Sequence, residues 1–309
     1  MLTRRRLIAI SAAMAASSWA GMAQARPAAR LWTGQALGAR ASIRLDHPQA
    51  EAIAARVFAE IDRLESILSL YRADSAVSRL NRDGRLDNPP FELLECLSIA
   101  GSVHSASGGC FDPTVQPLWA LWAEAAAAGE KPADAAIERA RLHVGWEKVE
   151  LNPSAITLQP GMSLTLNGVG QGYVADRVAV LLEAEGLNEI LIDSGEFRAL
   201  GGQPGGDDWP MLLETGARLA LRQRALATSS PLGTTFDQAG HDGHILDPVT
   251  GRPVRSGWRS VSISAPSAAI ADALSTASCL MPDQASIAGV IGQFFDARCE
   301  AAAPLSERS

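Results

Sequence analysis

A glycine-rich segment in the middle of the chain most constrains how it can fold. Gly168, Gly170 and Gly172 alternate with other residues between an apolar run at 164–166, which predicts a short strand, and an apolar stripe at helical spacing over 174–182. Free backbone amides at such a junction suit a phosphate, because a helix N-terminus favours negative charge. The spacing differs from the dinucleotide fingerprint of a doubly wound sheet, and no regular βαβ unit follows. The segment predicts phosphate binding in another class of fold.

Apolar periodicity elsewhere predicts an irregular mixture of strands and helices. Residues 39–45 alternate apolar and polar side chains, as a half-buried strand does, while residues 53–68 carry one apolar helical stripe. Further helices are predicted over 91–106, 133–143 and 267–280, and short apolar strands over 190–192 and 261–264. No internal repeat or low-complexity segment interrupts the chain. The irregular alternation favours one α+β domain over a doubly wound sheet.

The first residues have the composition of an export signal. Arg4 and Arg5 precede a stretch without charge that extends to about residue 22, and Ala23-Gln24-Ala25 is a small-x-small cleavage pattern. A membrane anchor is the alternative, but the apolar stretch is short for a span. The paired arginines favour the twin-arginine route, which carries folded proteins. We expect a cleaved signal over 1–25, a periplasmic protein without a stable membrane span, a domain over 28–300 and a polar tail over 301–309.

Charge and cysteine content exclude several classes of function. Cleavage removes three arginines and no acid, so the formal net charge of −7 becomes −10. Such a chain is poorly suited to polyphosphate surfaces, and it has no Lys/Arg stripe with interleaved aromatics, so we expect no nucleic-acid binding. The four cysteines, Cys96, Cys110, Cys279 and Cys299, show no C-x-x-C pair and do not predict a zinc or redox motif. Pairing of two of them and four reduced thiols are both compatible with the sequence.

Four further segments are richer in turn-forming and polar residues than folding requires. They are residues 68–81 around Tyr71, Gly-Gly-Cys-Phe-Asp-Pro-Thr-Val at 108–115, His-Ile-Leu-Asp-Pro-Val-Thr-Gly-Arg-Pro at 244–253, and Ala-Asp-Ala-Leu-Ser-Thr at 271–276. In the last segment Asp272 and Thr276, four residues apart, share one face of a small-residue helix. Oxygen ligands of this kind suit Mg²⁺, which keeps waters and binds substrate phosphates. Each segment by itself is also typical of an ordinary turn, helix exit or polar helix contact.

Taken together and in this order, the five segments resemble the ApbE family, the FAD:protein FMN transferases, over roughly residues 33–281. The resemblance implies two close lobes with a flavin nucleotide in the cleft between them and Mg²⁺ at its pyrophosphate. It also implies that FMN passes from FAD, the substrate, to a Thr or Ser hydroxyl of an exported or membrane-bound acceptor protein, and that AMP leaves. The twin-arginine signal and the Asp-Ser-Gly-Glu segment at 193–196 resemble members that serve nitrous-oxide-reductase maturation.

The resemblance also assigns individual residues. On the flavin it places Tyr71 and Leu37, where the family usually has Met. It matches Cys110, Phe111 and Asp112 to the family's Ala-Phe-Asp turn, with Asp112 on the adenine or ribose side. Along the dinucleotide it places Asn167, Tyr173, His244 and Ile245. The metal ligands it implies are the Gly170 carbonyl and the Asp272 and Thr276 side chains. Besides Leu37, other positions depart from the family pattern: Gln171 stands where Lys or Glu is usual, Ser194 and Phe197 replace Gly and Ile, and Ser229-Ser230 replaces Ser-Gly.

The chemistry that this resemblance implies leaves two points open: which group takes the proton of the acceptor hydroxyl, and whether the acceptor is a protein or water. The acceptor hydroxyl has a high pKa, so a base or the metal must assist it, and His244 and Asp247 are the candidates to orient or deprotonate it. Hydrolysis of FAD to FMN and AMP, with water as acceptor, is one alternative function. A flavin-binding module without catalysis is another, although a simple binder does not need Asp272 and Thr276.

Overall fold

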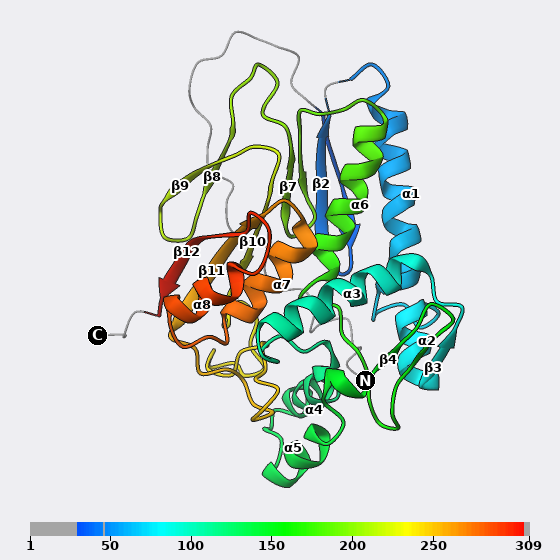
Figure 1. Cartoon of the computed structure of the whole chain (residues 1–309), viewed down its shortest axis with the longest axis vertical. Helices are drawn as coiled ribbons and strands as arrows, with labels where there is room; N and C mark the ends of the chain where they lie inside the picture. Colours follow the sequence, from blue (N-terminus) through cyan, green and yellow to red (C-terminus); the bar gives the residue numbers. More distant parts are fainter. Residues whose placement is uncertain (1–29, 46, 306–309) are drawn as a thin grey trace.

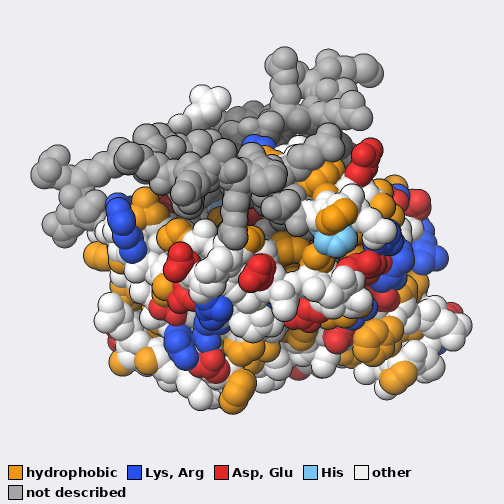
Figure 2. Space-filling view, turned by 90° about the horizontal axis from the view of Figure 1, so that it is seen from above, with side chains coloured by type: hydrophobic (Ala, Val, Ile, Leu, Met, Phe, Trp, Pro, Cys, Tyr) orange, Lys and Arg blue, Asp and Glu red, His pale blue; other side chains and the backbone are white. Residues whose placement is uncertain are grey.

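The computed structural model describes residues 30–45 and 47–305 of the 309-residue chain. The export signal expected over 1–25 lies outside the described residues. In the described part, none of the helices combines the length and apolar character that crossing a membrane requires. On the face in Figure 2, acidic and basic side chains are interspersed over the described surface.

The centre of the molecule is a seven-stranded sheet with the order β1-β2-β6-β7-β10-β11-β12. Its strands are β1 Arg30–Ala36, β2 Ala39–Leu45, β6 Ile190–Asp193, β7 Phe197–Leu200, β10 Ala225–Ser229, β11 Trp258–Ala265 and β12 Arg298–Pro304. Every neighbouring pair is antiparallel. A doubly wound fold has mostly parallel pairs, so the α+β prediction is confirmed.

Helices cover one face of this sheet (Figure 1). Helices α1 Ala50–Leu68, α6 Gly170–Ala184 and α7 Ala268–Ser278 pack on it, and α3 Phe91–Ala106 lies against α1 and α7. Strand β10 shows why both faces of the sheet are apolar. Its Ala225 and Ala227 belong to the large core under the helices, whereas Leu226 points into a smaller core on the other face. That second core is covered by the hairpin of β8 Trp209–Leu212 and β9 Arg218–Leu221.

A smaller lobe extends from the helical layer. It contains α4 Gln116–Ala127 and α5 Asp134–Arg141, whose apolar faces meet in a separate core with Leu246. Leu246 belongs to the long connection between β10 and β11, so this connection ties the lobe to the sheet. The remaining elements are α2 Ala76–Asp83, α8 Gln284–Ile291, the 3-10 turns η2 Pro113–Val115 and η3 Trp146–Lys148, and a sheet of β3 Arg85–Asp87, β5 Ala155–Thr157 and β4 Glu150–Leu151.

Two sequence-based expectations about the elements were wrong. Residues 164–166 do not form a strand, because the Asn81 side chain takes the place of a neighbouring strand: it donates to the Leu164 carbonyl (2.8 Å) and accepts from the Leu164 N–H (2.7 Å). The fold also does not end at residue 300. Strand β12 continues to Pro304, which lies opposite Trp258 of β11, so residues 301–304 are an edge of the sheet and not a polar tail. The helix predicted over 91–106 is confirmed.

Candidate active site where α6 meets α7

The glycine-rich segment brings the start of α6 into direct contact with α7. A side chain at Gly172 has no room, because a Cβ there would lie 2.2 Å from the Ala268 carbonyl oxygen. Asp176, one turn further along α6, accepts hydrogen bonds from Ser267 Oγ (2.7 Å) and from the N–H groups of Ala268 (2.9 Å) and Ala269 (3.0 Å). These bonds satisfy the free donors at the start of α7 and fix that helix end to α6.

Asp272 lies one turn into α7, in the interior beside the same glycine segment. It is 3% exposed, and its Oδ2 accepts a hydrogen bond from the Gly172 N–H (3.2 Å). Burial raises its pKa from 3.8 to about 7. The buried Glu196 carboxyl, which accepts from the Thr228 N–H (3.2 Å), has its pKa raised by burial and then by the nearby Asp272. Among the described residues no Lys or Arg forms an ion pair with Asp272, so the site favours a proton or an added cation.

Thr276 follows on the next turn of α7 and faces the first part of the glycine segment. Its Oγ1 lies 3.2 Å from Ser229 Oγ, and a Cβ at Gly168 would lie 3.0 Å from the same oxygen and 2.9 Å from Cε2 of Phe111. The structure therefore brings together the glycine segment, Phe111 and the two predicted metal ligands of α7. In the described part of the chain, at this site or at any other, no group of three or more His, Cys, Asp or Glu side chains is arranged to hold a metal.

The residues predicted for the flavin lie beside the middle of the glycine segment. Leu37 and Gly38 form the turn between β1 and β2. Leu37 reaches Gly170, where a Cβ would lie 2.8 Å from the Leu37 Cδ1 atom, and Gly38 lies against the Tyr71 ring, 3.0 Å from Cε2 to an ideal Cβ. Tyr71 is 49% exposed, so much of its ring is open to a ligand. Residues from three separate parts of the sequence thus meet beside the start of α6.

His244 and Asp247 lie on the connection between β10 and β11, and they differ in what they can do. The Nδ1–H of His244 donates to the Thr234 carbonyl (3.1 Å), and burial lowers the pKa of the imidazole, so the neutral ring has a free Nε2. Asp247 instead caps its own turn: Oδ1 accepts from the Val249 N–H (2.8 Å) and Oδ2 from the Thr250 hydroxyl (2.9 Å). Of these two side chains, His244 is the one with an acceptor atom, Nε2, that takes no hydrogen bond from the described residues.

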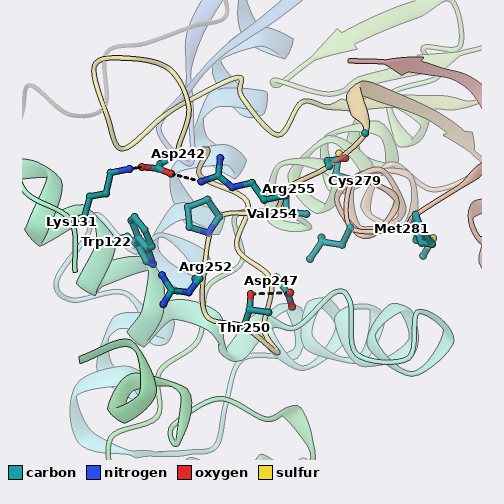
Figure 3. A pocket seen from close by; sticks show the side chains of 15 residues that line it. Trp122, Lys131, Asp242, Asp247, Thr250, Arg252, Val254, Arg255, Cys279 and Met281 are labelled. Atoms are coloured by element: carbon teal, nitrogen blue, oxygen red, sulfur yellow. Dashed lines mark hydrogen bonds and ion pairs between the residues drawn. The ribbon is translucent and has the colours of Figure 1, made fainter. Parts of the chain in front are cut away.

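A cavity of about 690 Å³ separates the small lobe from the C-terminal end of α7 (Figure 3). Its walls include Trp122 of α4, Asp247 and residues 279–282, the first of which lies three residues after Thr276. Asp242, which is buried, joins Lys131 (2.5 Å) to Arg255 (3.2 Å) across one end of the cavity. The cavity is a cleft between the small lobe and the C-terminal end of α7.

The sequence matches the ApbE family over residues 37–293. The chain belongs to the ApbE family. An FAD:protein FMN transferase of Klebsiella pneumoniae is 32% identical over 69% of this chain and 70% of its own length, and one of Treponema pallidum is 32% identical over 77% and 74%. The apo structure of Pseudomonas stutzeri flavinyl transferase ApbE has a TM-score of 0.76 at 25% identity, covering 89% of this chain and 93% of that one. The flavin transferase ApbE from Vibrio cholerae has the same fold, with a TM-score of 0.72 at 23% identity and coverage of 85% and 91%.

Several residues that the ApbE resemblance assigns to the nucleotide are engaged inside the protein. Asp112 is 8% exposed; Oδ1 accepts from the Thr114 N–H (2.8 Å) and Oδ2 from the Trp146 N–H (3.3 Å), so this carboxylate caps η2 and braces the chain. Tyr173 is buried and donates its hydroxyl to Glu95 of α3 (2.5 Å). Asn167 is exposed at the glycine turn and Ile245 is buried. Their contacts with a dinucleotide stay predictions.

The structure also decides the state of the cysteines. All four are free thiols. Cys110 is half-buried beside the predicted adenine residues, and burial together with the charge of Asp247 raises the pKa of its thiol. The Cys110 side chain is therefore a neutral, weakly polar part of the wall at neutral pH.

The sequence analysis did not predict the contacts of two residues that support this ApbE site, Asp176 and Glu196. The role of Asp176 in capping α7 depends on Ser267, which is 91 residues away in sequence. Its position four residues after Gly172 on one helix face was the available signal. Glu196 belongs to the Asp-Ser-Gly-Glu segment that the sequence analysis singled out, but its place beside Asp272 was not predicted, because it depends on the packing of β7 and β10 against α7.

Proposed function

We propose that this protein transfers FMN from FAD to a hydroxyl of another protein and releases AMP. The observation that carries the proposal is the meeting of Asp272, Thr276 and the start of α6 next to the wall of Leu37 and Tyr71. This arrangement offers a phosphate site and an aromatic ring at adjoining places, as a flavin nucleotide requires. The family relatives named FAD:protein FMN transferase support the same reaction.

The donor set fits Mg²⁺. Asp272 supplies a buried carboxylate without a Lys or Arg partner among the described residues, Thr276 a hydroxyl, and Gly170 a backbone carbonyl at the start of α6. When bound, Mg²⁺ neutralises charge on the pyrophosphate and on the phosphate of departing AMP. The first turn of α6 orients the phosphates, because its N–H groups and helix dipole favour negative charge there.

We assign to His244 the role of the base that accepts the proton of the acceptor hydroxyl. Its Nδ1–H is held by the Thr234 carbonyl, which leaves Nε2 as the acceptor, and its lowered pKa keeps the ring neutral near pH 7. Asp247 has the weaker claim, since both of its carboxylate oxygens already accept hydrogen bonds from its own turn. Asp247 therefore shapes the segment that carries His244 and borders the cavity.

The acceptor is proposed to be an exported or membrane-bound protein that meets this enzyme in the periplasm. The support is the paired arginine of the signal, Arg4 and Arg5, which the twin-arginine translocase reads. Replacing both with Lys should leave full-length precursor in the cytoplasm. Normal processing of that double variant in the periplasm contradicts the route. A maturation protein of nitrous-oxide reductase is the first acceptor to test.

The test of the reaction compares products with and without an acceptor. Purified enzyme, FAD, Mg²⁺ and the candidate acceptor should yield AMP with little free FMN, and EDTA should stop AMP release. Asp272→Ala should remove most of the activity and Thr276→Ala less, because a water can replace a neutral ligand. His244→Gln should slow transfer, whereas His241→Gln, at an exposed histidine of the same segment, should not. Free FMN appearing at equal rates with and without the acceptor means that the enzyme is an FAD hydrolase.

A further inference from the structure

The turn between β1 and β2 holds a residue in a conformation that its side chain does not favour. Leu37 and Gly38 are the two central residues of a two-residue hairpin turn, with φ of +49° and +87°. A turn with two positive φ values favours Asn followed by Gly, because few other residues accept the left-handed region. A leucine at the first position is strained there. Strain of this kind persists where surrounding contacts hold it.

Glu65 of α1 supplies such a contact. Its Oε1 accepts a hydrogen bond from the Leu37 N–H (2.8 Å), across 28 residues of sequence. Its Oε2 lies 3.8 Å from Nη1 of Arg72, which is itself paired with Asp62 (2.7 Å). The Glu65 side chain is 22% exposed, so this charge-assisted bond is partly shielded from water. One carboxylate therefore links the turn to the helix that leads into Tyr71.

The consequence of the strained turn is the placement of two groups at the proposed flavin site. Leu37 extends toward Gly170 at the start of α6, and Gly38 lies against the Tyr71 ring. An Asn at position 37 satisfies the turn but offers no apolar surface, so the leucine is informative about what the turn faces. If the turn relaxed, Leu37 would leave Gly170 and the wall would lose its shape.

We propose that Glu65 is a positioning residue for FAD: its carboxylate holds the turn of Leu37 and Gly38 between Gly170 and Tyr71, so that the wall for the flavin ring is formed before FAD binds. The inference rests on the proposed function and adds a residue to that site. When the wall is already formed, FAD binding does not have to order the turn, and the free-energy cost of that ordering does not weaken binding.

Fluorescence titration with FAD, riboflavin and AMP tests the proposal. Glu65→Ala should raise the Kd for FAD and for riboflavin about tenfold, the size of one charge-assisted hydrogen bond, and leave the Kd for AMP unchanged. Glu65→Gln should bind like the wild type within about threefold, since its amide oxygen can accept the same N–H. Glu60→Ala is the matched control, because Glu60 lies on the same helix and pairs with Arg63 (2.8 Å), away from the turn.

A double-mutant cycle separates positioning from general damage. In a Leu37→Asn background the turn no longer needs Glu65, so Glu65→Ala should change the Kd for FAD less than about threefold there. Equal losses in both backgrounds, or equal losses for FAD, riboflavin and AMP, overturn the inference. Wild-type Kd values for Glu65→Ala overturn it too while leaving the proposed function in place. If the wild-type protein binds no FAD, the proposed function fails and the inference falls with it.

Discussion

Replacing Asp272 with Asn should make the ligand-free protein more stable while removing its metal-dependent activity. Asp272 is 3% exposed and accepts a hydrogen bond from the Gly172 N–H, which the side-chain oxygen of Asn can also accept. The substitution keeps the shape of the side chain and deletes a buried charge that no described Lys or Arg balances. Stability and activity should therefore move in opposite directions.

The size of the gain follows from the pKa of the carboxyl group. The pKa of Asp272 is raised from 3.8 to about 7, so between these values the folded protein holds more protons than the unfolded chain. Its contribution to stability falls as pH rises through this window, and the whole penalty is present above about pH 7. At about 1.36 kcal/mol for each pH unit, the penalty approaches ~4 kcal/mol. At pH 5 less than half of it has developed.

Urea unfolding in EDTA at pH 5 and pH 8 measures this difference. The gain in unfolding free energy from Asp272→Asn should be larger at pH 8 than at pH 5 by about 2 to 3 kcal/mol. Asp207→Asn, at an exposed loop residue, should show no such difference. Added Mg²⁺ should stabilise the wild type and not the Asn variant. An Asn variant that is less stable than the wild type at pH 8 refutes the idea of an uncompensated charge.

Three further outcomes are expected. Gly172→Ala places a methyl group 2.2 Å from the Ala268 carbonyl oxygen. The substitution should therefore lower the free energy of unfolding, measured in urea, by about 3 kcal/mol. A near-neutral effect contradicts the close approach of α6 and α7. Burial lowers the pKa of His244, so stability should be lost as pH falls from about 6.5, the unfolded value, toward the folded value, and His244→Gln should flatten that part of a urea-derived pH profile. An identical profile in this variant means that His244 protonates freely. Tyr173→Phe removes the bond to Glu95 and should cost about 1 to 3 kcal/mol in the same assay without changing the Kd for FAD; a clear rise in that Kd shows instead that the hydroxyl contacts the nucleotide.

Local patterns predicted the elements whose burial follows a simple period. Helix α3 has the bounds expected from its apolar spacing, and the stripe over 53–68 lies within α1. Prediction failed where distant groups decide the structure. The apolar run at 164–166 has strand composition, but Asn81 occupies its hydrogen-bonding groups. Strand β12 ends in Ala-Ala-Ala-Pro, which has no strand pattern, and only its pairing with β11 makes it an edge of the sheet.

In the candidate site, too, local spacing predicted some features, while contacts between distant residues decided others. Asp272 and Thr276 lie four residues apart on one helix, so their common face followed from spacing alone. The contacts that hold the site do not follow from spacing. Glu65 meets Leu37 across 28 residues, and Asp176 meets Ser267 across 91. The interior position of Asp112 also needed the structure, since the groups bound to its two oxygens lie 2 and 34 residues away.

Mass spectrometric mapping of the acceptor tests the central claim most directly. After incubation with enzyme, FAD and Mg²⁺, fragmentation of the acceptor should locate FMN on one Thr or Ser side chain through a phosphoester, with one AMP released for each FMN attached. The modification should be absent with Asp272→Ala enzyme and with EDTA. An acceptor that remains unmodified while FAD is converted to free FMN and AMP contradicts protein flavinylation and identifies the enzyme as a pyrophosphatase.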